Sequence, residues 1–185
     1  MKSRNRLIFS VLVASMILMV STLVSAQSDA QKSFDEIKML AGAWQGPVTV
    51  DPPMKDMQDG SGVKVSLRVT SRGNAIVHEM TDPAKPDDPT KVDHPVTMFY
   101  LDNGQLLLTH YCDAGNRPRM VAKSSPDGKT LDFDFLDVAG PTNYGHMQHA
   151  TFTIINANHH IEEWTYLMPG DKPMHARMDL QRAKQ

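Results

Sequence analysis

Residues 96–111 read VTMFYLDNGQLLLTHY, and this stretch predicts a β-hairpin. Two runs rich in apolar and β-branched residues, Val96–Leu101 and Leu106–Tyr111, flank the pair Asn103-Gly104. An Asn-Gly pair between two such runs is the strongest short-range signal for a tight hairpin turn. We therefore expect two antiparallel strands here.

The same strand pattern continues on both sides of this hairpin. Further short runs of strand character are Val63–Val69, Ile76–Met80, Met120–Lys123, Leu131–Phe135, Phe152–Ile155, Ile161–Leu167 and Met174–Leu180. No helical pattern of ten or more residues separates them, so parallel strands would lack connectors. A long open meander exposes its edges, whereas closure removes them. We predict an all-β fold, an antiparallel up-and-down β-barrel of about ten strands, with a two-sheet sandwich as the alternative.

The first 26 residues have the features of a secretory signal peptide. Lys2, Arg4 and Arg6 precede an apolar run from Leu7 to Val24, and Val24-Ser25-Ala26 supplies small residues before the expected cut. An uncleaved membrane anchor is the alternative, because the run approaches the length of a membrane span. We predict cleavage before Gln27, export to the periplasm or beyond, and a single domain over residues 27–185.

A short amphipathic helix is expected at the start of this domain. Ser33-Phe34-Asp35-Glu36 has the form of a capping box, Ile37 and Leu40 follow Phe34 at helical spacing, and Gly42 ends the pattern. The predicted helix has about two turns and precedes all the strands.

The charge balance narrows the range of partners. Without the three basic residues of the leader, 16 Lys and Arg face 21 Asp and Glu, a formal net charge of −5. Because no basic run is present to neutralise phosphates, we expect neither nucleic acid nor, after signal cleavage, a membrane surface as partner. The one cysteine, Cys112, cannot form an internal disulfide, so the core alone must hold the domain together.

The segment LAGAWQG, residues 40–46, runs from the predicted helix into the first strand. Its Gly-x-Trp resembles the signature of lipocalins, and the full Gly-x-Trp-x-Gly resembles that of nitrobindin-like and fatty-acid-binding-like calycins. Together with EWTY (residues 163–166), the segment resembles exported bacterial calycin-like proteins of unassigned function. The resemblance implies a barrel with a cavity for a small apolar molecule or haem. Pro47 and Val48 depart from the nitrobindin-like pattern, which continues with glycine, and we assign no cofactor. Gly42, Trp44 and Gly46 are expected to be structural, with Trp44 closing one end.

The hairpin strand that ends at Cys112 supplies candidate ligand contacts. His110 and Cys112 are two residues apart on a strand and share a face with Leu106 and Leu108, so we expect them inside the barrel. Asn116 and Arg119, in and after the following turn, are candidates for contacts at the mouth. A cysteine nucleophile with a histidine base would need the base supplied from another element, and buried free cysteine is common, so no catalytic residue is assigned.

A second set of candidates lies on the strands around Asn156-Ala157-Asn158. A three-residue turn places Glu162 and Trp164 on the inner face with Phe152, and Arg119 or His110 would then neutralise Glu162. The alternative is that Glu162 lies at the rim in water.

The remaining histidines add one candidate. His146 is a further candidate ligand contact and, with His110, the likeliest metal ligand, although no closed metal-ligand spacing is present and no metal site is assigned. His159-His160 is interpreted as a solvated hairpin end.

These patterns favour an exported, non-enzymatic barrel that binds a small apolar or amphipathic molecule. The thirteen methionines, several of them on predicted strands, suit an adaptable apolar interior. An enzyme that works inside the barrel, with His110 as acid or base beside Glu162 or Arg119, is the first alternative. A structural or protein-interaction module is the second.

Overall fold

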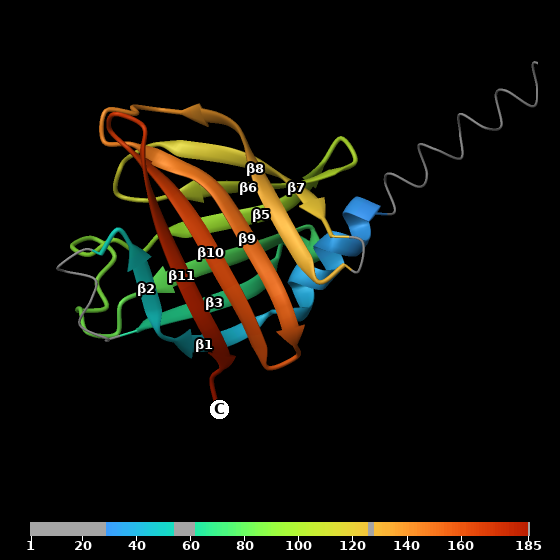
Figure 1. Cartoon of the computed structure of the whole chain (residues 1–185). Helices are drawn as coiled ribbons and strands as arrows, with labels where there is room; N and C mark the ends of the chain where they lie inside the picture. Colours follow the sequence, from blue (N-terminus) through green and yellow to red (C-terminus); the bar gives the residue numbers. More distant parts are fainter. Residues whose placement is uncertain (1–28, 54–61, 126–127, 185) are drawn as a thin grey trace, which may run out of the picture.

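The computed structural model describes residues 29–53, 62–125 and 128–184, which form a closed antiparallel β-barrel (Figure 1). The strands are β1 (Gly42–Gly46), β2 (Val48–Asp51), β3 (Val63–Thr70), β4 (Ala75–Thr81), β5 (Val96–Asp102), β6 (Gln105–Tyr111), β7 (Arg117–Ser124), β8 (Thr130–Ala139), β9 (His146–Asn156), β10 (His159–Met168) and β11 (Lys172–Arg182). From β3 to β11 each strand pairs with the next. The predicted fold class is confirmed.

Closure of the barrel depends on the short segments β1 and β2. β1 pairs with β3 on one side and with the end of β11 on the other, through Trp44 opposite Arg182. β2 follows after one residue, Pro47, and continues along β11 from Met178 to His175. The two segments thus act together as one bent strand, which gives the ring the ten members expected from the sequence.

The turns take the conformations that their residues favour. Asn103 and Gly104 have φ values of 48° and 75°, and Asp102 pairs with Gln105 directly before and after them. This is the two-residue hairpin predicted from Asn-Gly. Between β3 and β4 the chain turns through the short 3-10 segment η2 (Ser71–Gly73).

One helix, residues 29–39, lies at one end of the barrel (Figure 1). Phe34 and Ile37 are buried on its inner face, as the helical spacing predicted, and Leu40, directly after the helix, is buried as well. The capping box was wrong, because the helix is already formed at residue 29 and Ser33 lies within it, buried against the barrel. The predicted signal peptide, residues 1–26, lies outside the described residues. None of the described helical segments has the length and apolar character to span a bilayer.

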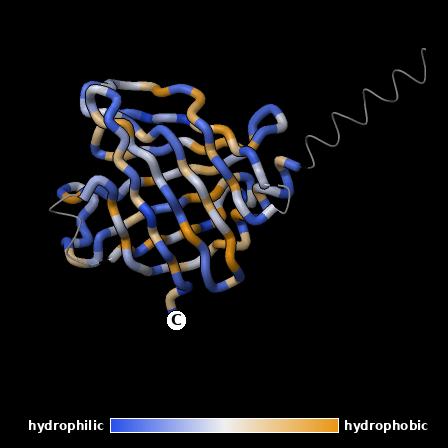
Figure 2. Tube along the Cα trace, viewed as in Figure 1, coloured by the Kyte–Doolittle hydropathy of each residue, from blue (hydrophilic) through white to orange (hydrophobic). Residues whose placement is uncertain are grey.

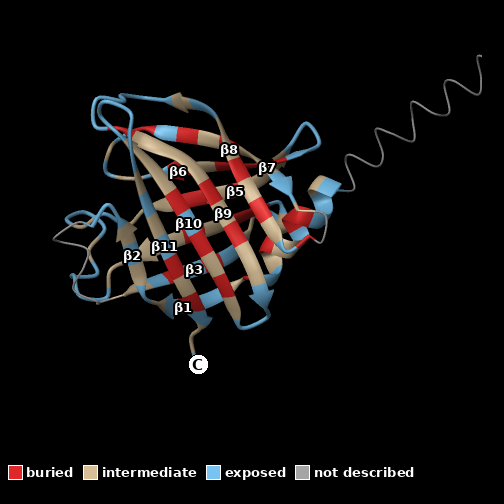
Figure 3. Ribbon diagram, viewed as in Figure 1, coloured by how far each residue is buried: buried red, intermediate tan, exposed pale blue. Residues whose placement is uncertain are grey.

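Along most strands every second residue points into the barrel, so buried and more accessible positions alternate, as on β5 and β9 (Figure 3). The hydropathy of the chain alternates in the same way (Figure 2). Phe99, Phe133 and Phe152 form an aromatic cluster with ring centroids 5.4–5.9 Å apart, in the edge-to-face arrangement that aromatic pairs prefer.

Trp44 closes the barrel beneath the helix. It is buried, and its Nε1 donates to the carbonyl oxygen of Leu40 at 2.7 Å. The guanidinium of Arg182 lies 4.2 Å from the centre of the Trp44 ring and donates to the carbonyl oxygen of Ala41 at 2.8 Å. At Gly46 a Cβ atom would overlap the backbone carbonyl of Asp179, so only glycine allows this close approach. The motif therefore joins the helix, β1 and β11.

Candidate functional site

A cavity of about 340 Å³ occupies the end of the barrel opposite the helix. Four methionine side chains from β4, β9 and β11 contribute to its wall, namely Met80, Met147, Met174 and Met178. Val48, Val63, Pro95 and Ala176 add further apolar surface. Because the thioether chain is flexible and polarizable, such a wall adapts to irregular apolar shapes.

The mouth of the cavity is acidic. Asp82, Asp93 and Asp113 line it together with one basic residue, Lys85. Nζ of Lys85 lies 3.6 Å from Asp82, and the backbone N–H of Asp113 donates to Asp93 at 3.1 Å. Burial, followed by the charge of Asp113, raises the pKa of Asp93.

His110, on β6, is a polar residue of the cavity lining. Its side chain is fully buried, and Nδ1 lies 2.9 Å from the hydroxyl oxygen of Thr97 on β5. Nε2 is buried without a hydrogen-bond partner among the described residues. Burial, with a smaller contribution from His78, lowers the pKa of His110 from 6.5 to about 3, so the imidazole is neutral near pH 7.

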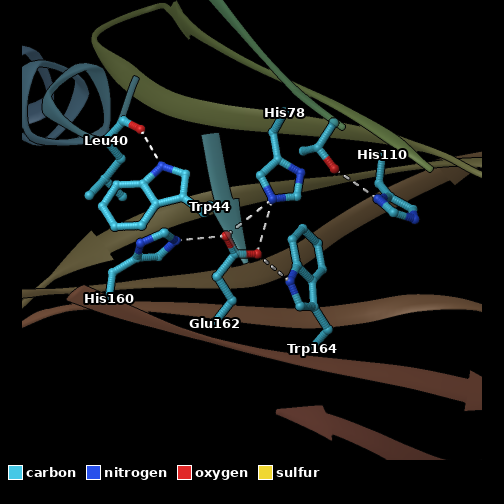
Figure 4. Close-up of polar contacts among 8 residues, drawn as sticks. Leu40, Trp44, His78, His110, His160, Glu162 and Trp164 are labelled. Carbon is cyan, nitrogen blue, oxygen red and sulfur yellow. Dashed lines mark hydrogen bonds and ion pairs between the residues drawn. The ribbon is translucent and has the colours of Figure 1, made fainter. Parts of the chain in front are cut away.

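Directly next to the cavity, on its helix side, lies a buried carboxylate network around Glu162 (Figure 4). Nε2 of His78 lies 3.2 and 3.0 Å from the two carboxylate oxygens, and Nε2 of His160 lies 3.0 Å from one of them. The indole N–H of Trp164 donates to the other at 3.0 Å. Burial alone would raise the pKa of Glu162, but the charge of His78 and the hydrogen bonds from both histidines outweigh it and lower the pKa.

Trp164 connects this network to the cavity. The ring lines the cavity wall while its N–H is held by Glu162, and the ring centroid lies 5.4 Å from that of His110. The carboxylate therefore fixes the orientation of one wall of the cavity without itself belonging to the lining.

The sequence candidates on β6 and β10 lie where the alternation placed them. His110, Cys112 and Trp164 line the cavity, and Glu162 points inward, fully buried. Glu162 pairs with Phe152 across the β9–β10 hairpin and faces inward, so the rim alternative is wrong. The predicted three-residue turn is also wrong: Asn156 pairs with His159 across a two-residue turn, and a register shift between His159 and His160 restores the inward placement. Cys112 is half-buried, and burial raises the pKa of its thiol.

The structure corrects the other three candidates. Arg119 lies on the outer face of β7, between the buried Pro118 and Met120, and its Nε donates to Asp137 at 2.8 Å. It is therefore not a ligand contact in the cavity and cannot neutralise Glu162. Asn116 is buried, but its amide donates to the carbonyl oxygens of Pro141 and Gly145 at 2.9 and 2.7 Å and ties two loops together.

His146 does not contribute to the cavity either. Its ring stacks on Phe135 with centroids 5.0 Å apart, while the next residue, Met147, lines the cavity. The pair His110 and His146, predicted as the likeliest metal ligands, therefore does not meet.

Sequence reasoning missed two of the buried histidines. His160 was interpreted as part of a solvated hairpin end, but it lies two residues before Glu162 on β10, shares that residue's inward face and is fully buried. His78 alternates with Ile76 and Met80, and this spacing was the signal that could have placed it inside.

Among the described residues, Asp132, Asp134 and His149 form a group with the composition of a metal site on the outer surface. Nε2 of His149 already lies 2.9 Å from Asp132, the Thr151 hydroxyl donates to Asp132 at 2.8 Å, and Lys123 pairs with Asp134. These cross-strand contacts account for the group without an ion.

Comparison with known proteins identifies no family. No family model matches the chain, and no curated protein matches it. One solved structure that is similar, a protein of unknown function from the DUF3598 family of Nostoc punctiforme PCC 73102, aligns with a TM-score of 0.49 and 8% sequence identity. The alignment covers 80% of this chain and 49% of that chain, so this chain spans about half the length of that protein. The site is therefore interpreted from its own residues.

Proposed function

We propose that this protein is an exported binding barrel that holds a small apolar or amphipathic molecule in the cavity at the open end. The observation that supports this most is the cavity itself, about 340 Å³ in volume and bordered by four methionines and Trp164. Pockets of ~300–1,000 Å³ with mostly apolar walls and a few placed polar groups are typical of small-molecule sites. The leader-like N-terminus supports export, and mature protein would then begin at Gln27.

The side chains proposed for an internal enzyme do not support catalysis as well. Arg119 is outside the barrel, and Glu162 is engaged by His78, His160 and Trp164. A histidine with a pKa of about 3 is also a weak base at neutral pH. Binding is therefore the function that this geometry favours.

A cavity-filling variant tests the proposal. Ala176 lines the cavity, whereas Ala139 is exposed on β8 and does not contribute to the lining, so Ala176→Phe and Ala139→Phe are a matched pair. The fluorescence of 1-aminoanthracene, which rises in apolar surroundings, is titrated against each purified protein. We expect the wild type and Ala139→Phe to bind the dye equally and Ala176→Phe to bind it at least about tenfold more weakly, since the added ring occupies the space. Equal binding by all three, or by none, would overturn the proposal.

A further inference from the structure

We infer that the ligand of this cavity is uncharged and presents a hydrogen-bond acceptor, a carbonyl or ether oxygen, to the Nε2–H of His110. This inference rests on the proposed function and names the chemical class of molecule that the site takes. It follows from three features of the described residues, namely the hydrogen bond between Thr97 and His110, the position of Nε2, and the charges at the mouth.

The hydroxyl of Thr97 fixes where the proton of His110 lies. Thr97 is fully buried, and among the described residues Nδ1 of His110 is the one hydrogen-bond partner of its hydroxyl. A buried O–H needs an acceptor, so the hydroxyl donates and Nδ1 accepts. A neutral imidazole that accepts at Nδ1 carries its proton at Nε2. Nε2 is therefore a hydrogen-bond donor.

This donor belongs to a ring in the cavity lining and is buried with no hydrogen-bond partner among the described residues. In Figure 4 Nε2 lies on the side of the ring that faces away from Glu162. Nδ1 of His78 and Nδ1 of His160 also lack partners, but neither residue lines the cavity. An unpaired donor in an apolar site is costly, and a ligand oxygen removes that cost.

The charges around the cavity disfavour an anion. Three aspartates line the mouth, and Lys85, the one basic residue of the lining in the described chain, already lies beside Asp82. His110 is neutral and offers no counter-charge. Arg119 and Arg182 lie on the outer face and at the closed end, respectively. A carboxylate would thus be desolvated without a cation to pair with, whereas a neutral carbonyl or ether would not.

Three naphthalenes that differ in one substituent test this class of ligand. 2-Acetylnaphthalene offers a neutral acceptor, 2-ethylnaphthalene offers none, and 2-naphthoate carries a carboxylate. Binding is measured by isothermal titration calorimetry, with quenching of the tryptophan fluorescence, to which Trp44 and Trp164 both contribute, as the second measurement. We expect the ketone to bind about three- to tenfold more tightly than the ethyl compound, the size expected for one neutral hydrogen bond, and the carboxylate to bind most weakly.

Two variants show whether His110 is responsible. Thr97→Val/His110→Phe removes both partners of the internal hydrogen bond and leaves no orphaned hydroxyl. We expect it to bind ketone and ethyl compound equally. Thr97→Val alone frees the proton to move to Nδ1, so the preference for the ketone should shrink while binding of the ethyl compound stays unchanged. Restoration of the wild-type ratio in Thr97→Ser would assign the effect to the hydroxyl.

The outcomes separate this inference from the proposed function. Binding of the ketone and the ethyl compound with equal affinity, or tighter binding of the carboxylate, would overturn the inference and leave the binding function standing. If none of the three binds, both are wrong. A measurement without ligand is independent of these titrations: ¹⁵N NMR of histidine-labelled protein should show His110 with a protonated Nε2 and an unprotonated Nδ1. The reverse tautomer would also overturn the inference.

Discussion

The same alternation of inward and outward residues builds both halves of this barrel, but side chains fill the interior of only one of them. On the helix side, Phe99, Phe133 and Phe152 fill the interior, and the carboxylate of Glu162 accepts hydrogen bonds from three side chains. On the open side, methionines border an unfilled volume of about 340 Å³, and Nε2 of His110 has no partner within the described residues.

The difference shows that strand alternation decides which residues point inward, but not whether they fill the space. The aromatic rings on the helix side contact one another edge to face, and the helix and Trp44 cover that end. The open end has no such cover among the described residues, and its flexible side chains line the wall instead of meeting across it. The closed, helix-side half is thus packed and covered, whereas the open half keeps an unfilled volume.

The largest expected loss of stability comes from Glu162, in the closed half, and its sequence neighbour Glu163 provides the control. Glu162→Ala removes the acceptor of two buried histidines and the Trp164 indole and should lower the free energy of unfolding by about 3–5 kcal/mol. Glu163→Ala, a change at the next residue, breaks only an exposed pair with Arg177 and should cost less than about 1 kcal/mol. Urea unfolding of both variants measures the two values. Similar losses would show that the network does not stabilise the closed half.

Two methionines give the next largest contrast. Met120 is fully buried in the packed core, whereas Met174 lines the cavity. Met120→Ala should cost about 2–5 kcal/mol, because it leaves a new void in a filled region. Met174→Ala enlarges a volume that is already empty on one side and should cost less than about 1 kcal/mol. Chemical denaturation gives both numbers, and an equal cost at the two sites would mean that the open half is packed as tightly as the closed one.

The fold could be predicted from the sequence because the alternation of apolar and polar residues within a strand is visible in a few consecutive residues. The Asn103-Gly104 turn and the alternation on β3 and β10 each required only a few consecutive residues. The same alternation placed His110 inside, whereas for Glu162 it left both the inner face and the rim open. Pairings between neighbouring strands were predictable for the same reason.

The network itself was not predictable, because its members come from distant parts of the chain. His78 and Glu162 are 84 residues apart, and only barrel closure brings them together. The placement of His160 and Glu162 on the same face as Phe152 depends on a register shift after the two-residue turn of β9–β10, and no local signal announces that shift. Arg119 was misplaced for a third reason: its turn was known, but the register of the strand after Pro118 was not.

The smallest effect concerns the pH dependence of stability and isolates His110. The folded protein holds this ring neutral, with a pKa of about 3 against 6.5 for an ordinary histidine. Between those values the unfolded chain binds a proton that the folded chain does not, so acidification favours unfolding. At about 1.4 kcal/mol per pH unit, this one group should cost the wild type about 2 kcal/mol between pH 6.5 and pH 5.

His110→Phe should remove that contribution, so its free energy of unfolding should fall by about 2 kcal/mol less than the wild type's over the same interval. Glu162 does not interfere, because the lowered pKa of its carboxyl affects stability only below its ordinary value of about 4.5. Unfolding by urea at pH 7, 6 and 5 gives both slopes, and the comparison is independent of any constant loss that the substitution causes. Parallel curves for the two proteins would mean that His110 takes up a proton in the folded state, and the open half would then be more hydrated than its burial indicates.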